Sequence, residues 1–196
     1  ADTIAPVASV SKTVAGLAAL LVFSEFNVPK DTRIGDLLPQ VPVRNHFGEP
    51  LRLIHLMEHT SGLQEVIYPW PKTPSAAYAP LGELLFNILP EQRVRWTPGL
   101  ATTYSNYNYT LLMHVLERVT GESFDAVMQK RVLDPLNMRS TSFRIDRVDR
   151  GRLALGYHPG ERMPLPHSDS FYRSSAGMYT TIADLAVGTD AGQIKT

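Results

Sequence analysis

The most apolar part of this chain is the stretch SVSKTVAGLAALLVFSEF, which covers residues 9–26. From Ser11 to Phe26 it is rich in Ala, Leu and Val, and its apolar side chains would lie on nearly every side of a helix. A helix of this kind packs at the centre of a fold rather than on its surface. The clean apolar run from Val14 to Phe23 is also shorter than the roughly 18–20 residues that a membrane-spanning helix needs. The stretch therefore predicts a central, buried helix.

Two side chains with catalytic potential, Ser9 and Lys12, stand at the start of this helix. Positions three apart share a helical face, so the Lys12 amine can reach the Ser9 hydroxyl, whereas Ser11 points elsewhere. Burial beside an apolar helix and the positive end of the helix dipole both favour a neutral amine. A neutral Lys12 can accept the hydroxyl proton while Ser9 attacks an acyl carbonyl. Because Ser-x-x-Lys also arises often by chance, the pair needs support from the rest of the chain.

A second polar group, Tyr104-Ser105-Asn106, lies in a loop that leads into a predicted helix. A tyrosine placed against an amine can relay a proton, and an asparagine amide can hold a substrate carbonyl. A simpler interpretation of the same residues is an aromatic-rich turn in which Tyr104, Tyr107 and Tyr109 only pack. Taken alone, the turn is the better interpretation.

The rest of the chain predicts helices more readily than strands. Apolar spacing and turn residues place helices at 34–38, 51–59, 81–88, 107–119 and 123–132. A further helix is expected to begin at Ile182, where Thr181 and Asp184 form a capping pattern. Convincing alternating strands are scarce, so the sequence predicts a mainly helical chain.

Composition narrows the classes of function. The chain has 19 Lys and Arg and 19 Asp and Glu, so it has no general attraction to nucleic acid or to an anionic membrane. With no cysteine, it cannot form disulfides, thiolate metal sites or a cysteine nucleophile. It also lacks the G-x-S-x-G turn of the α/β-hydrolases, a phosphate-binding glycine loop and a recognisable signal peptide.

Residues 55–59, His-Leu-Met-Glu-His, match the H-x-x-E-H motif of inverted zinc peptidases. In that motif two histidines on one helical face hold the metal. A zinc peptidase that uses His55, Glu58 and His59 is therefore a minor alternative. Against it, Gly62 would end the helix almost at once.

Several ordered segments resemble the serine β-lactamase and penicillin-binding-protein superfamily, in particular its class C and esterase-like branch. They span residues 8 to about 186, and a chance match of so many ordered motifs is very unusual. The matching segments are 8–13 (ASVSKT), 56–63 (LMEHTSGL), 98–99 (PG), 104–107 (YSNY), 133–138 (LDPLNM) and 175–185 (SAGMYTTIADL).

The resemblance implies a role for each candidate residue. Ser9 would form the acyl-enzyme, Lys12 would activate it, and Tyr104 would assist proton transfer to the leaving group or from the deacylating water. Asn106 would bind the amide or ester side of a small acyl substrate. The Ser9 backbone N–H would supply half of an oxyanion hole, and residues 59–62 would form a structural loop. No metal or cofactor is expected.

The resemblance also implies an α+β fold, in which a helical domain lies beside an antiparallel sheet flanked by helices. This chain carries mostly the helical part, so we expect a single incomplete domain over residues 1–196. Residues 1–8 would be the remnant before the nucleophile helix, 9–186 the motif-bearing region and 187–196 an unassigned tail. The strand that usually bears Lys-Thr-Gly or His-x-Gly has no counterpart here, since Lys195-Thr196 lacks the glycine and comes too early.

Two functional hypotheses follow from the resemblance. The first is a serine hydrolase that cleaves an ester, an amide or a β-lactam-like bond. The alternative is a non-catalytic, truncated protein that binds a partner or an acyl ligand. In either case, self-association is expected through the face that a sheet would cover. The family resemblance favours a periplasmic or secreted location.

Overall fold

A computed structural model describes residues 2–41, 43–65, 93–160, 162–165 and 172–188 of the chain. The longer helices are α1 (Ser11–Glu25) and α5 (Asn106–Thr120). Shorter α-helices are α2 (Ile34–Leu37), α3 (Leu53–Met57), α6 (Phe124–Met128), α7 (Arg173–Ala176) and α8 (Ile182–Gly188). The 3₁₀ turns are η1 (Ala8–Val10), η5 (Ile145–Arg147) and η6 (Arg150–Arg152), and η4 (Gln129–Leu133) is a π-helix.

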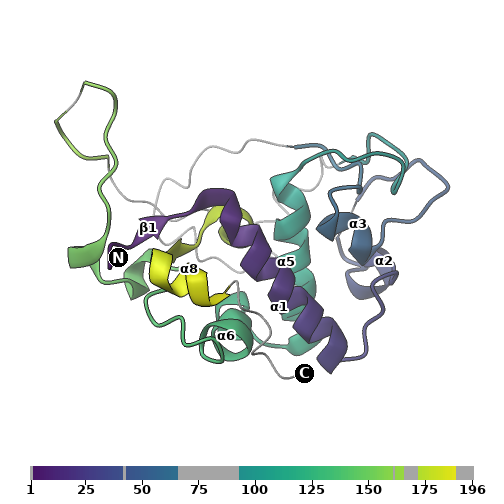
Figure 1. Ribbon diagram of the computed structural model, residues 1–196. Coiled ribbons are helices and arrows are strands. Elements are labelled where there is room, and N and C mark those ends of the chain that lie inside the picture. The colour runs from purple at the N-terminus through teal and green to yellow at the C-terminus, as the bar shows by residue number, and fades with distance from the viewer. Residues whose placement is uncertain (1, 42, 66–92, 161, 166–171, 189–196) are drawn as a thin grey trace.

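Helices α1 and α5 pack together in the middle of the molecule (Figure 1). The apolar residues of α1 are buried on several sides, among them Val14, Ala18 and Val22. This confirms the central helix that the sequence predicts. The partner face of α5 is its buried apolar stripe, which includes Leu111 and Leu112. Burial of these two faces forms one main core and fixes the start of α1 beside the start of α5.

Residues 8–25 form the one helical stretch in the described part of the chain that is long and apolar enough to cross a membrane. Half of this stretch is buried inside the fold. Core helices of globular proteins share this length and composition, and the packing against α5 favours that interpretation.

One small sheet is present in the described residues. Strand β1 (Ala5–Pro6) pairs antiparallel with β2 (Tyr179–Thr180), with Ala5 opposite Thr180. The sheet places β1 beside the segment that follows α7, so the turn before α1 contacts a region far away in the sequence. A helix-rich chain with so little sheet agrees with the expected partial α+β fold. The expected self-association stays a prediction.

The expected short helices are present with shifted ends. Helix α3 stops at Met57, before the predicted end at His59, and the predicted 123–132 helix continues from α6 as the π-helix η4. Thr181 caps α8 by accepting a hydrogen bond from the Asp184 N–H. The Asp184 carboxylate itself accepts from Ser140 and Thr141, so the capping pattern is only half formed. The predicted helix 81–88 lies outside the described residues.

Gly62 is required by the turn between α3 and the following segment. Its φ is +71°, and an added Cβ would lie 2.3 Å from the Trp96 carbonyl oxygen. We expect Gly62→Ala to lower the free energy of unfolding by about 3 kcal/mol or more, since strain and overlap with backbone combine. Urea unfolding measures this. Gly35→Ala, in α2 with open space around it, is the matched control and is expected to be neutral or slightly stabilising. Equal effects of the two changes would contradict the account.

Candidate active site

The candidate nucleophile, Ser9, lies in the 3₁₀ turn η1 that joins β1 to α1. Its side chain is exposed, and the preceding residue, Ala8, has a φ of +45°. A non-glycine residue in this region stores about 1–3 kcal/mol of strain, which the surrounding structure must hold. The Ser11 hydroxyl stabilises this turn, because it donates to the Ala8 carbonyl (2.5 Å) and accepts from the Met178 N–H (3.0 Å). Ser11 is therefore buried and tied into the fold, while Ser9 is open to a ligand.

The Lys12 amine is buried beneath Ser9 and has three hydrogen-bond partners. Its Nζ lies 3.2 Å from Ser9 Oγ, 2.7 Å from Asn106 Oδ1 and 2.8 Å from the Ser175 carbonyl oxygen. The two last atoms can only accept hydrogen bonds. A neutral amine has two N–H groups and one lone pair. In that form, which a general base needs, Lys12 would donate its N–H groups to these two acceptors and turn its lone pair to the Ser9 hydroxyl.

Tyr104 is the fourth member of the group. Its hydroxyl lies 2.8 Å from Ser9 Oγ and 3.3 Å from Asn106 Oδ1, and Lys12 Nζ lies 4.8 Å from its ring centroid. The structure thus brings together Ser9, Lys12, Tyr104 and Asn106, which the sequence places in two segments about ninety residues apart.

The three tyrosines of this segment divide into two kinds. Tyr107 and Tyr109 are buried and pack, as the simpler interpretation of the sequence proposed for all three. Burial, with a smaller contribution from Tyr104, raises the pKa of Tyr109, whose ring lies near the Lys12 amine and the His59 ring. Tyr104 differs because nearly half of its surface is exposed and its hydroxyl contacts the candidate nucleophile. Only Tyr104 is therefore placed to meet a substrate.

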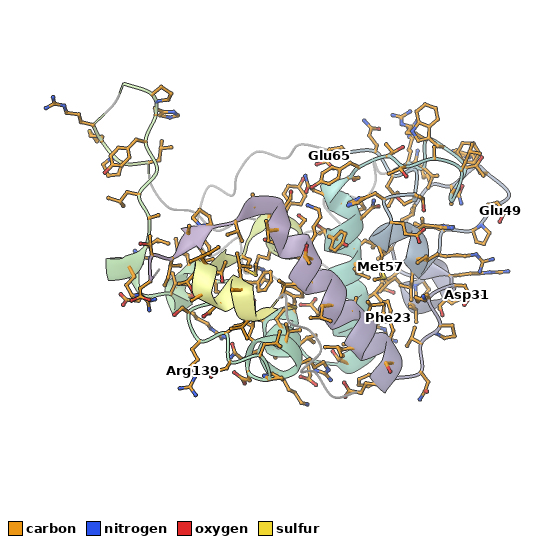
Figure 2. All side chains as sticks on the ribbon, in the orientation of Figure 1. Phe23, Asp31, Glu49, Met57, Glu65 and Arg139 are labelled. Carbon is orange, nitrogen blue, oxygen red and sulfur yellow. The ribbon has the colours of Figure 1, made fainter. Side chains whose placement is uncertain are left out.

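Asn106 is the first residue of α5, and its amide is held by a residue that sequence reasoning missed. Ser105 is the N-cap and accepts from the Tyr107 N–H. Glu65 accepts from the Asn106 backbone N–H (2.5 Å) and from its side-chain Nδ2 (2.9 Å). Figure 2 shows Glu65 at the end of α5 where the helix begins. No motif marks Glu65, and the Ser175 carbonyl is equally invisible in a sequence because every residue has one.

His59 supports the same loop from behind. Its Nδ1 accepts from the Ser105 N–H (3.3 Å) and contacts Asn108 Nδ2 (3.0 Å), and its ring stacks on Tyr104 at a centroid distance of 4.5 Å. Ser61 fixes the polarity of this contact, since its hydroxyl donates to Asn108 Oδ1 and turns the Asn108 NH₂ group toward His59. His59 therefore carries its proton on Nε2 and holds Tyr104 in place.

The structure does not place His55 and His59 as an H-x-x-E-H zinc site requires. His59 lies beyond the end of α3 with a φ of +57°, so it does not share a helical face with His55. His55 Nδ1 accepts from the Arg52 N–H, and His59 Nδ1 is occupied by the loop. In the part of the chain that the structure describes, no three His, Cys, Asp or Glu side chains gather at metal-binding distance. In this chain the last histidine of the H-x-x-E-H motif, His59, thus supports the loop that carries Tyr104.

The stability of this site is expected to depend on pH through His59. Burial, and then the charge of Lys12, lower the pKa of His59 below its ordinary value of 6.5. The unfolded chain therefore binds a proton more readily than the folded one, so stability is full above pH 6.5 and falls as the pH drops below it. Urea unfolding at pH 7.5, 6.5 and 5.5 measures this loss.

His55 titrates in the same direction, because burial lowers its pKa too, so a variant must separate the two histidines. His59→Asn suits this purpose, since asparagine tolerates a positive φ and offers an oxygen acceptor near the position of Nδ1. We expect a smaller loss of stability between pH 7.5 and 5.5 in this variant than in the parent protein. An unchanged loss would show that His59 does not couple to folding.

Comparisons with known proteins agree with this geometry. The esterase EstB of Burkholderia gladioli is 32% identical over 181 residues, which cover 86% of this chain and 45% of EstB. The crystal structure of FmtA from Staphylococcus aureus superposes with a TM-score of 0.79 at 24% identity, covering 98% of this chain and 51% of FmtA. A β-lactamase/D-alanine carboxypeptidase from Yersinia pestis gives a TM-score of 0.74 at 24% identity, covering 96% and 53%.

These superpositions define the class of the fold, which is that of the β-lactamase and transpeptidase proteins, represented here chiefly by its helices. The chain belongs to the β-lactamase family, whose sequence model matches residues 1–194. It spans about half the length of the relatives that it matches. The predicted superfamily is therefore confirmed.

Proposed function

We propose that this protein is a serine hydrolase that acts through an acyl-enzyme on Ser9. The observation that carries the proposal is the set of contacts around Lys12. Two acceptor-only oxygens, from Asn106 and Ser175, and the exposed Ser9 hydroxyl all lie within hydrogen-bond distance of the amine. A buried amine poised in this way serves as the base for an accessible nucleophile.

The proposal implies a sequence of proton transfers. Lys12 takes the proton of Ser9 as Oγ bonds to the acyl carbon, and the Ser9 backbone N–H stabilises the oxyanion. The bond to the leaving group then breaks while the Tyr104 hydroxyl supplies its proton. The proton held by Lys12 restores the tyrosine. In the second half, water attacks the acyl-enzyme by the reverse transfers, and Ser9 regains its proton as the acid leaves.

We propose an ester as the substrate class. EstB is an esterase by name, and it matches this chain at higher identity than the two solved structures described above. The Yersinia pestis structure, a β-lactamase/D-alanine carboxypeptidase by its title, supports amide or β-lactam substrates as alternatives. A non-catalytic binding role is the competing proposal, because the chain spans about half of each relative.

A pre-steady-state assay with a small chromogenic ester tests the proposal. An acyl-enzyme mechanism predicts a rapid burst of released alcohol, close to one equivalent per protein, followed by slower turnover. Ser9→Ala should give no burst, because it lacks the hydroxyl that forms the acyl-enzyme. Ser24→Ala, which removes an exposed hydroxyl near the other end of α1, should give the same burst as the parent. Well-folded parent protein that gives neither a burst nor turnover with ester, amide or β-lactam probes favours the binding role.

A further inference from the structure

The shape of the Asn106 side-chain amide allows two orientations, which differ by a half-turn that exchanges Oδ1 and Nδ2. Its oxygen and its NH₂ group have nearly the same size, so only the neighbouring donors and acceptors decide which of them faces Lys12. In the structure Oδ1 faces the Lys12 amine and the Tyr104 hydroxyl, and Nδ2 faces away. The chemistry proposed for Ser9 depends on this choice.

We propose that Glu65 is a positioning residue that fixes the orientation of the Asn106 amide and thereby aims the lone pair of Lys12 at Ser9. The proposal rests on the proposed function and extends it to a residue outside the group that contacts the nucleophile. Glu65 is half-buried, and both of its oxygens are engaged by Asn106, one by the backbone N–H and the other by Nδ2.

The polarity of the carboxylate is what makes the orientation unique. An ionised carboxylate only accepts hydrogen bonds, so it is satisfied only when the Asn106 NH₂ group points at it. The Oδ1 atom must then point at Lys12, where it takes one N–H of the amine. The charge-assisted bond to the backbone N–H, at the start of a helix of fifteen residues, holds the carboxylate itself in place.

The opposite orientation would disable the base. With the amide turned round, Nδ2 would present an N–H to Lys12 in place of an acceptor. The only group on a neutral amine that can accept it is the lone pair, which would then point at Asn106 instead of Ser9. The Tyr104 hydroxyl would lose its 3.3 Å contact with Oδ1 as well. A wrong orientation thus removes the base and loosens the relay.

Glu65→Gln tests the proposal with little change in size. Glutamine offers one acceptor oxygen for two donors, so the Asn106 amide is either left with an unpaired group or free to turn toward the glutamine NH₂. We expect the rate constant for acylation of Ser9 by a fluorophosphonate to fall about 10–100-fold, as is typical for residues that orient a reacting group. Glu58→Gln removes the same charge from an exposed side chain nearby and is expected to leave the rate unchanged.

A double-mutant cycle separates positioning from general loss of structure. If Glu65 acts through the amide, Glu65→Gln should cost little in a protein that already carries Asn106→Ala. If the fold-losses in acylation rate of the two single variants instead multiply in the double variant, Glu65 acts independently of Asn106, and the proposal is overturned. If the parent protein is labelled at Ser9 and Glu65→Gln reacts at the same rate, the proposal fails while the proposed function stands.

A second measurement does not need any activity. The side-chain amide protons of Asn106, assigned by their loss in Asn106→Asp, should exchange slowly with water in the parent protein and faster in Glu65→Gln. Glu58→Gln should exchange as the parent does. Equal exchange in the parent and in Glu65→Gln would overturn the positioning role, whether or not Ser9 reacts.

Discussion

Replacing Ser9 with alanine is expected to reduce hydrolysis of a reactive ester by about 10⁴-fold or more, to the level that binding and the oxyanion donor alone provide. The change removes the only atom that can form the acyl-enzyme in the proposed mechanism. The side chain is exposed and its loss leaves the turn held by Ser11, so stability should hardly change. Turnover numbers with a chromogenic ester, together with urea unfolding, measure both effects.

Ser24→Ala is the matched control for this experiment. Ser24 is an exposed serine near the other end of the same helix, so its loss tests the effect of removing a hydroxyl from α1. It should leave turnover unchanged. Residual turnover in Ser9→Ala above a few per cent of the parent would mean that another group carries the reaction.

Lys12→Met should lower the acylation rate by about 10³-fold, within the range that general bases contribute. Methionine fills a similar volume without an amine, so Asn106 Oδ1 and the Ser175 carbonyl lose their donor while the packing is kept. The rate constant for labelling of Ser9 by a fluorophosphonate measures the loss without requiring complete turnover.

Two further variants show whether Lys12 acts as a base or only as a charge. Lys12→Arg retains a positive charge but cannot release a proton at working pH, so it should be as inactive as Lys12→Met. Lys30→Met removes a lysine from an exposed position and should react as the parent does. A Lys12→Arg protein that retains most of the acylation rate would show that the charge, and not the lone pair, is what matters.

The central helix and the candidate nucleophile could be predicted because their signals are local. An apolar run flanked by Lys12 and Glu25 specifies α1, and the three-residue spacing of Ser9 and Lys12 survives even though Ser9 lies in a 3₁₀ turn rather than in the helix itself. Residues three apart share a face in a 3₁₀ turn as in an α-helix, so the predicted contact between Ser9 and Lys12 holds in either structure.

The supports of the site could not be predicted, because they depend on tertiary contacts. Glu65 follows a turn with no motif of its own, and it becomes important only where the chain brings it to the start of α5. The Ser175 carbonyl carries no sequence signal. The sequence predicts residues 59–62 as a structural loop, which agrees with the place of His59, but its left-handed backbone and its contact with the Tyr104 ring appear only in three dimensions.

The shifted helix ends have physical causes of the same kind. Helix α3 ends early because residues 59–62 turn back under the loop that carries Tyr104, with the His59 carbonyl accepting from the Thr103 N–H. The π-helix η4 extends α6 while Arg131, at its centre, pairs with Glu25 at the end of α1 and with Glu122. Because Arg131 and Glu25 lie far apart in the sequence, their ion pair cannot be predicted from the periodic spacing of apolar residues.

The most direct test of the central claim is intact-mass analysis of the protein after treatment with a fluorophosphonate, followed by peptide mapping. The account predicts one adduct per chain, located on Ser9, formed rapidly by the parent protein, about 10³-fold more slowly by Lys12→Met and not at all by Ser9→Ala. An adduct on another residue, or a well-folded parent protein that stays unmodified, would contradict the assignment of Ser9 as an activated nucleophile.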